Sequence, residues 1–298
     1  MWGVLFPVIR EAVAGEKAVV GPPFFNQVTG PMFFLLLALM LFGPFVAWKG
    51  DNLKKVFNQL LPSLIFGLIV SLILIYLKPT YILAAFSIGL GVAVIFSLEK
   101  LVRSTAVKRR KDGNLAGAYK EIIRSKSRRF GGHVVHFGVA IMAIAITASY
   151  VYKTEKDITL KIGEKAEVGS YQFKLDDVFE SPQSSYHAIV AKVSVYKGDK
   201  KISTLHPERR AYAREVTTEV ALEMNLLNDL YVAFAGIDIA GRDSSNLKTL
   251  PLIFKIYINP LQVWLWFGSI LVIIGTLIVL LKTETVKTET INTVGNEQ

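Results

Sequence analysis

Five long apolar runs limit what this chain can fold into more than any other feature of its sequence. The runs have 18 to 22 residues each, and none of them contains Asp, Glu, Lys or Arg. At 1.5 Å per residue, a helix of this length spans roughly 27–33 Å, which is the thickness of a hydrocarbon core. Every backbone polar group must be satisfied inside such a segment, so we expect five transmembrane helices. The runs are Pro31–Trp48, Leu60–Leu77, Tyr81–Leu98, Gly131–Tyr150 and Pro260–Leu281.

The distribution of positive charge predicts the orientation of these spans. Residues 99–130 carry 11 Lys and Arg against three acidic residues, which is +8 of the chain's net charge of +10. Cytoplasmic loops carry an excess of Lys and Arg, so we place this segment in the cytoplasm. We expect it to contact anionic membrane lipid rather than nucleic acid, because no aromatic or fold signature accompanies the charge.

Residues 151–257 differ in composition from the rest of the chain. They carry 15 basic and 15 acidic residues and contain short β-prone runs, several of which alternate apolar and polar residues. This is the period of half-buried strands, and turn signals such as KGDK separate the runs. We expect an antiparallel β domain, a small barrel or sandwich. The runs are 158–162, 171–175, 187–196, 217–224, 230–236 and 252–258.

The sequence therefore predicts a multi-pass protein of the cytoplasmic (inner) membrane, with a β domain between its last two spans. We expect Asn259 to cap the last helix and Pro260 to take its first turn, and VGPPFFNQVTGP to approach the first span as a rigid non-helical segment. The predicted segments are an extracytoplasmic N-terminal segment (1–30), three transmembrane helices (31–98), a basic cytoplasmic loop (99–130), a helix with His136 (131–150), the extracytoplasmic β domain (151–257), the last transmembrane helix (258–282) and a cytoplasmic tail (283–298).

Two histidines in the run RRFGGHVVHFG are the strongest candidates for chemistry. His133 and His136 lie within the fourth span, where ionisable residues are rare and are functional candidates. Neutral imidazole is a good ligand for haem iron. The two side chains are three residues apart and share a helix face, so they cannot bind one iron from opposite sides of a porphyrin. No other span contains a histidine, and a bis-histidine site therefore needs another polypeptide or a second copy.

His136 is the better ligand candidate of the two. It lies about five residues, or roughly 7–8 Å, inside the span, on a stripe of small residues, Gly132, Ala140 and Ala143, that lets a helix or a flat ring come close. His133 is nearer the headgroups and can snorkel. The alternative is that both histidines only form hydrogen bonds between helices. No catalytic residue is assigned, because no nucleophile–base pair, phosphate loop, zinc motif or intramembrane carboxylate pair occurs, and the chain has no cysteine.

Other polar and aromatic residues have simpler interpretations. We expect His187 and His206 on the surface, and Trp264 and Trp266 in an aromatic belt at the outer end of the last span. The run HPERRAYAR (206–214) contains three arginines. It is either a solvated strand edge or a docking patch for carboxylates such as haem propionates.

Seven pieces of the sequence, taken in order, resemble CcmF, the membrane component of cytochrome c maturation in the haem-handling protein superfamily. The resemblance covers nearly the whole chain, but only the C-terminal half of a typical family member. The pieces are VGPPFFN, FGPFVAW, FGGHVVHFGVAIMAIAI, PERRAY, TTEVAL, DLYVAF and NPLQVWLWFGSILVIIG.

The resemblance implies a site and a function. His136 falls on the family histidine that is an axial ligand to the iron of a transmembrane b-type haem, whereas His133 falls on a variable position. The chain would be the C-terminal subunit of a haem lyase that supports reduction and covalent attachment of haem to apocytochrome c. Its partners would be an N-terminal CcmF-like subunit with a Trp-rich haem-handling loop, a CcmE-like haem chaperone and apocytochrome c.

The sequence also departs from the family. The Trp-rich loop, its flanking histidines and the other transmembrane histidine ligand are absent, so the chain is either a natural split CcmF subunit or a truncated reading of a longer gene. MWGVLFPV reads like the end of a helix. The alternative function is a non-catalytic membrane scaffold that holds the haem-handling subunit and docks the chaperone or the apocytochrome. A transporter is disfavoured, because internal repeats and intramembrane charges are missing.

Overall fold

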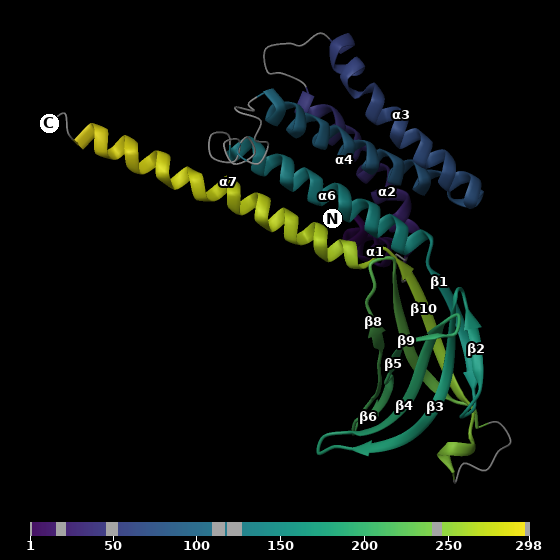
Figure 1. Cartoon of the computed structure of the whole chain (residues 1–298). Helices are drawn as coiled ribbons and strands as arrows, with labels where there is room; N and C mark the ends of the chain where they lie inside the picture. The colour runs from purple at the N-terminus through teal and green to yellow at the C-terminus, as the bar shows by residue number, and fades with distance from the viewer. Residues whose placement is uncertain are drawn as a thin grey trace. The chain divides into compact units, whose positions relative to one another are not determined.

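The computed structural model describes residues 2–15, 22–45, 53–108, 117, 127–239 and 246–295 (Figure 1). The chain divides into two compact units, which are described separately. One unit is helical and consists of Met1–Ile144 and Phe267–Gln298, and the other, Ala145–Trp266, contains the β strands.

The five predicted spans are confirmed among the described residues. Five helices are long and apolar enough to cross a membrane, and the longest such span, Pro79–Val107, has 29 residues. The chain is thus built as a multi-pass membrane protein. The helices are α1 (Trp2–Ala14), α2 (Pro22–Phe42), η1 (Gly43–Phe45), α3 (Leu53–Leu77), η2 (Pro79–Tyr81), α4 (Ile82–Lys108), α6 (Ser127–Val151), α7 (Val263–Gly295) and, near the end of the β domain, η3 (Leu247–Thr249).

Two helix starts differ from the predictions. The first spanning helix begins at Pro22, so the segment that we expected to be a non-helical approach forms its first turns. Prolines fit the first turn of a helix, and Pro31 inside it is tolerated in a membrane span. At the other end, Pro260 lies in strand β10, opposite Asn228, and α7 begins only at Val263. The predicted cap at Asn259 was therefore wrong.

The helix ends also differ from the sequence prediction. Helix α7 continues to Gly295, beyond the predicted end of the last span at residue 282. Most of the basic segment between Lys108 and Ser127 lies outside the described residues.

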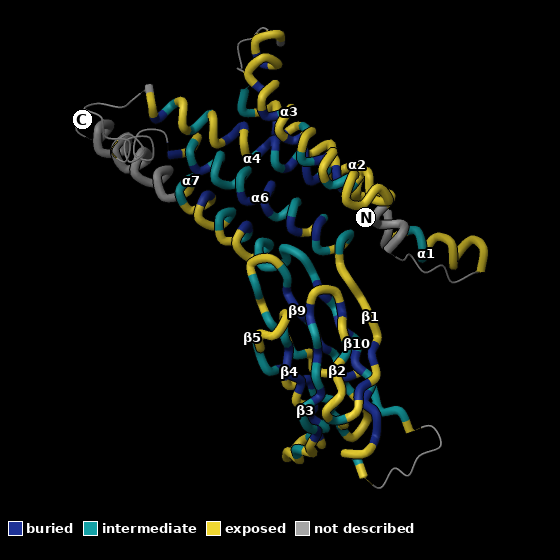
Figure 2. Tube along the Cα trace, turned by 45° about the vertical axis from the view of Figure 1, so that its right-hand side comes forward, coloured by how far each residue is buried: buried dark blue, intermediate teal, exposed yellow. Residues whose placement is uncertain are grey.

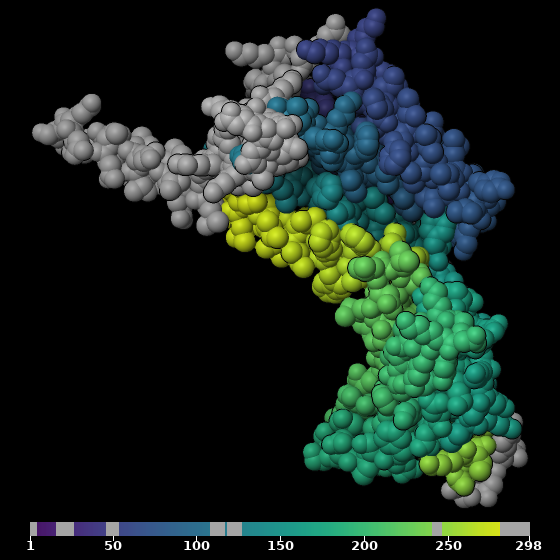
Figure 3. All heavy atoms as spheres, viewed as in Figure 1, coloured from purple at the N-terminus to yellow at the C-terminus, as the bar shows by residue number. Residues whose placement is uncertain are grey.

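Glycines bring α6 and α7 into backbone contact. A Cβ atom added to Gly131 would lie 2.6 Å from the carbonyl oxygen of Gly275, and one added to Gly138 would lie 2.7 Å from that of Gly268. Both helices thus place glycines seven residues apart, in antiparallel register. Small residues at such positions allow membrane helices to pack closely. In Figure 3 the yellow atoms of α7 lie directly against the teal atoms of α6.

The β domain consists of two antiparallel sheets that curl around one core, as the predicted barrel or sandwich requires (Figure 1). One sheet has the order β1-β10-β9-β8, and the other has the order β2-β3-β4-β6-β7 with β5 also paired to β4. The strands are β1 (Thr154–Leu160), β2 (Lys165–Val168), β3 (Tyr171–Pro182), β4 (His187–Lys197), β5 (Lys200–Leu205), β6 (Glu208–Ala211), β7 (Val216–Glu219), β8 (Ala221–Glu223), β9 (Asn228–Ile237) and β10 (Leu252–Pro260).

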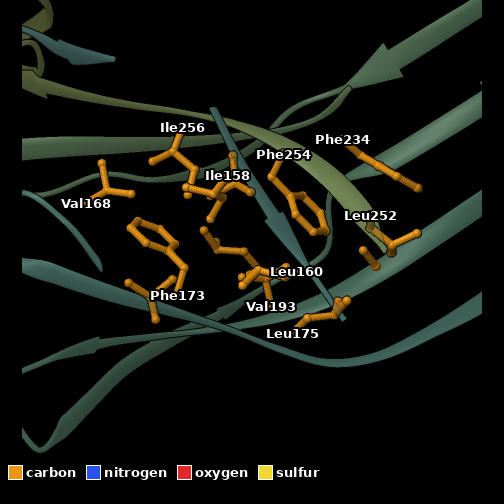
Figure 4. Close-up of a cluster of buried hydrophobic side chains, with 14 of the residues drawn as sticks. Ile158, Leu160, Val168, Phe173, Leu175, Val193, Phe234, Leu252, Phe254 and Ile256 are labelled. Atoms are coloured by element: carbon orange, nitrogen blue, oxygen red, sulfur yellow. The ribbon is translucent and has the colours of Figure 1, made fainter. Parts of the chain in front are cut away.

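The core of this domain follows from alternating side chains in its strands. Along β10, buried residues alternate with half-buried ones from Leu252 to Ile258, and Figure 2 shows dark blue and teal segments in the strands of this domain. Phe173, Phe234 and Phe254 are fully buried, and the rings of the last two lie 5.5 Å apart. Figure 4 shows these side chains between the sheets.

All six runs predicted to form strands contain strand, but the run 217–224 is divided at Val220 into β7 and β8, which lie in different sheets. Strands β2 and β5 were not predicted, and β6 lies in the run 206–214, for which a strand edge was one of two interpretations. They have four to six residues and are rich in Lys, Glu and Arg, so their alternation is too weak to read from the sequence.

Candidate functional site

Helix α6 brings His133 and His136 to one cavity in the helical unit. The cavity has a volume of about 740 Å³, within the range of roughly 300–1,000 Å³ that is usual for small-molecule sites. The prediction that the two imidazoles share a face of the helix is confirmed, because both line this cavity. His133 therefore lies beside the same space as His136.

The opposite wall of the cavity is apolar and comes from α2 and η1. Its residues include Leu36, Leu39 and Met40 of α2 and Phe45 of η1. Leu36 and Leu39 remain 44% and 61% exposed, so this wall is open on one side. A group bound beside the histidines would thus be covered only in part by the described residues.

The imidazole of His136 has an unsatisfied atom. Its Nδ1 is buried and has no hydrogen-bond partner among the described residues. Buried polar atoms in native proteins nearly always have a partner, because leaving one without a partner is costly. The alternative role, a hydrogen bond to another helix, is therefore not seen at this atom. A ligand or a partner from outside the described residues would have to satisfy the ring.

The predicted stripe of small residues has two different roles. Gly132 lines the cavity, and a Cβ atom added there would meet nothing within 4 Å. Ala140 is fully buried, and Ala143 packs against the same cluster of helix residues. Only the end of the stripe at Gly132 therefore leaves room for a flat ring, whereas the rest packs helices together.

The cavity is also lined by two arginines, which were predicted only to belong to the basic loop. Arg128 and Arg129 precede the glycine pair on the first turn of α6. A guanidinium group binds a carboxylate through two parallel hydrogen bonds. The cavity thus combines imidazole, apolar and cationic side chains. The sequence RRFGG, in which both arginines stand just before the glycine pair, is the pattern that could have predicted their place in the cavity.

The described part of the chain holds no group of three or more His, Cys, Asp or Glu residues that could bind a metal ion. Within these described residues, His133 and His136 are the histidines that line the cavity.

The remaining histidines lie on the surface of the β domain, as predicted. His187 lies 3.4 Å from a carboxylate oxygen of Glu180, and both side chains are about half exposed. His206 is exposed. Neither residue lines a cavity with the other.

Two of the three arginines in the run 206–214 form ion pairs or hydrogen bonds within the β domain. Arg210 pairs with Glu208 at 2.9 Å and with Glu219 at 3.2 Å, and the Glu208 carboxylate raises its pKa above the usual range. Arg209 donates a hydrogen bond to the carbonyl of Ala235. Strand β6 lies between β4 and β7 and is not an edge strand. The predicted edge position is therefore wrong, whereas the docking role of the run stays a prediction.

The chain is similar to proteins of cytochrome c biogenesis. Residues 151–260 match the family model described as the CcmF C-terminal beta-sandwich. The chain is 29% identical to the cytochrome c-type biogenesis protein CcmF of Pseudomonas aeruginosa over 286 residues, 92% of this chain. It is 29% identical to CycK of Bradyrhizobium diazoefficiens over 92% of its length, and 26% identical to CcmF of Escherichia coli over 93%.

A solved structure shows the same arrangement of elements. The protein named cytochrome c haem lyase CcmF matches 94% of this chain with a TM-score of 0.71 and 25% sequence identity. The chain spans 42% of that protein and about 40% of the curated relatives named above. The similarity therefore covers both units of this chain and less than half of each full-length relative.

Proposed function

We propose that this chain, whose β domain is a CcmF C-terminal β-sandwich and whose helices match the same proteins, is the C-terminal subunit of a CcmF-like haem lyase in cytochrome c maturation. Its part in that activity is to contribute one axial histidine, His136, to a transmembrane b-type haem. The haem supports reduction and covalent attachment of haem to apocytochrome c.

The observation that carries this proposal is the cavity beside His136. The cavity is large enough for a cofactor, and one of its walls carries an imidazole with a buried, unpartnered ring nitrogen. The apolar wall suits a porphyrin, and Arg128 and Arg129 suit its propionates. The residues present therefore fit haem, and the open space beside Gly132 fits the approach of a flat ring.

A second histidine, from outside these 298 residues, would complete the coordination. The chain has four histidines, of which two lie on the β domain and two share one face of α6. One face of a porphyrin can accept only one of this last pair. The open side of the cavity at Leu36 and Leu39 is where an N-terminal CcmF-like subunit would bring the second histidine.

Haem bound here would supply one-electron transfer. The side chains of this chain would then have three tasks. His136 provides a lone pair and, with its surroundings, sets the reduction potential. Leu36, Met40 and Phe45 exclude water, and the arginines balance carboxylate charge. We place the β domain on the extracytoplasmic side of the inner membrane, where a CcmE-like chaperone and apocytochrome c would dock.

The experiment is to co-purify the chain with its N-terminal partner and to record the absorption spectrum of the complex. The wild type should show a b-type spectrum, and His136→Ala should abolish it. His133→Ala is the matched control, since it removes an imidazole from the same cavity and should leave the spectrum in place. A b-type spectrum that survives His136→Ala would refute the ligand role. Normal c-type cytochrome yield with that variant would favour a scaffold.

A further inference from the structure

The segment that joins β8 to β9 presents large apolar side chains to its surroundings. Met224, Leu226 and Leu227 are 59%, 69% and 66% exposed. The four residues Met224–Leu227, here named the 224–227 loop, contain no charged side chain. A contiguous exposed apolar patch of this kind marks a site of interaction with another apolar surface.

Two hydrogen bonds fix this loop to the start of α7. The N–H of Leu261 donates to the carbonyl of Leu227 at 2.9 Å, and the indole Nε1–H of Trp264 donates to the carbonyl of Leu226 at 2.8 Å. The membrane span of α7 begins at Val263. The 224–227 loop is therefore hydrogen-bonded to Leu261 and Trp264, at the residues where this span starts.

The loop is also held in one conformation from within the β domain. The N–H of Asn225 donates to Asp229 at 3.0 Å, and Asp229 is only 2% exposed. Gln262, next in the turn before α7, donates to the hydroxyl of Tyr231 at 2.7 Å. The apolar side chains are thus presented at a fixed height beside the helix.

We infer that the 224–227 loop inserts into the lipid interface beside α7 and anchors this end of the β domain to the bilayer. The loop is hydrogen-bonded to Trp264 on the first turn of α7, and Trp266 on the same turn is 63% exposed. Trp side chains prefer this depth in a membrane. Apolar side chains inserted here gain from leaving water, as those of interfacial segments do. Because the loop is uncharged, its insertion does not depend on anionic lipid.

The absence of cysteine from the chain allows a direct test by spin labelling. Single cysteines at Leu226 and at Leu227 would be labelled with a nitroxide in the full chain, reconstituted into phosphatidylcholine vesicles. Collision rates with oxygen, which concentrates in lipid, and with a water-soluble nickel chelate would then be measured. We expect an oxygen-to-nickel ratio several-fold above that of an aqueous position, with no change when anionic lipid is added.

Two control positions show which oxygen-to-nickel collision ratios are typical of water and of lipid. Ile239 follows the far end of β9, and its side chain is 60% exposed. This position is roughly 30 Å along the strand from the loop. A label on Ile239→Cys should therefore collide mainly with the nickel chelate. Ile270→Cys lies on the span of α7, 53% exposed, and should collide mainly with oxygen. A label at Leu226 that behaves like Ile239 would overturn the inference. So would shielding from both reagents in vesicles that also contain the N-terminal partner, since protein would then cover the loop.

Discussion

The adjacent glycines 131 and 132 should respond in opposite ways to the same substitution. A Cβ atom at Gly131 would lie 2.6 Å from the carbonyl oxygen of Gly275, about 0.8 Å short of the 3.4 Å at which ordinary contact begins. The obstacle is backbone and cannot rotate away, so α6 and α7 must separate. A Cβ atom at Gly132 would meet nothing within 4 Å. Only the first substitution therefore overpacks the helix pair.

The magnitudes follow from general costs of packing and helix formation. Overpacking typically costs about 1–3 kcal/mol, so Gly131→Ala should lower the free energy of unfolding by about that amount. Gly132→Ala should be neutral or should stabilise α6 by up to about 1 kcal/mol, since alanine is the better helix former. The helix-propensity gain is shared by both variants, and the difference between them therefore isolates the contact with α7.

The assay is reversible unfolding of the purified chain in mixed micelles by a denaturing detergent, followed by circular dichroism. Gly138→Ala should behave like Gly131→Ala, since its Cβ would lie 2.7 Å from the carbonyl oxygen of Gly268. Equal stability of the variants at 131 and 132 would refute the close packing of α6 against α7.

Three further predictions concern the cavity and the β domain. Gly132→Phe should fill the space beside His136 and abolish haem binding by the complex while leaving the helical circular dichroism unchanged. Phe254→Ala should destabilise the β domain by about 3–5 kcal/mol in thermal unfolding, because this ring is fully buried in the core. Burial raises the pKa of the Asp229 carboxyl. The stability that this residue contributes is therefore fully present below the usual pKa of a carboxyl, where the group is protonated, and is lost as pH rises through the raised pKa. The variant Asp229→Asn keeps a side-chain oxygen that can accept the hydrogen bond from Asn225. Unfolding measured across pH should show that this variant is more stable than the wild type at pH 7, and that the difference disappears in acid. A difference that grows in acid would contradict this prediction.

Composition and periodicity were sufficient to predict much of this fold. The spans follow from uncharged runs of bilayer length, and the main strands from alternation in residues such as those of β10. The exact start of α7 could not be predicted, because Asn259 and Pro260 suit a helix start and the end of a strand equally well. Pairing with β9 decides between them, and the turn at Leu261, with a φ of 57°, follows.

The candidate site was only half predictable. The two histidines stand out because titratable groups are rare in a span, and their shared face follows from their spacing. The apolar wall from α2 and η1 depends on which helices are neighbours, and no local pattern contains that information. The same holds for the glycines of α6 and α7, whose register becomes visible only when Gly131 is found opposite Gly275.

The central claim is that the His136 imidazole binds haem iron, and chemical rescue tests it most directly. In His136→Gly, co-purified with the N-terminal partner, the side chain is replaced by space that free imidazole can enter. The variant should lack the low-spin b-type spectrum and regain it on addition of imidazole, whereas His133→Gly should show the spectrum without any addition. A full low-spin spectrum in His136→Gly before imidazole is added would contradict the claim.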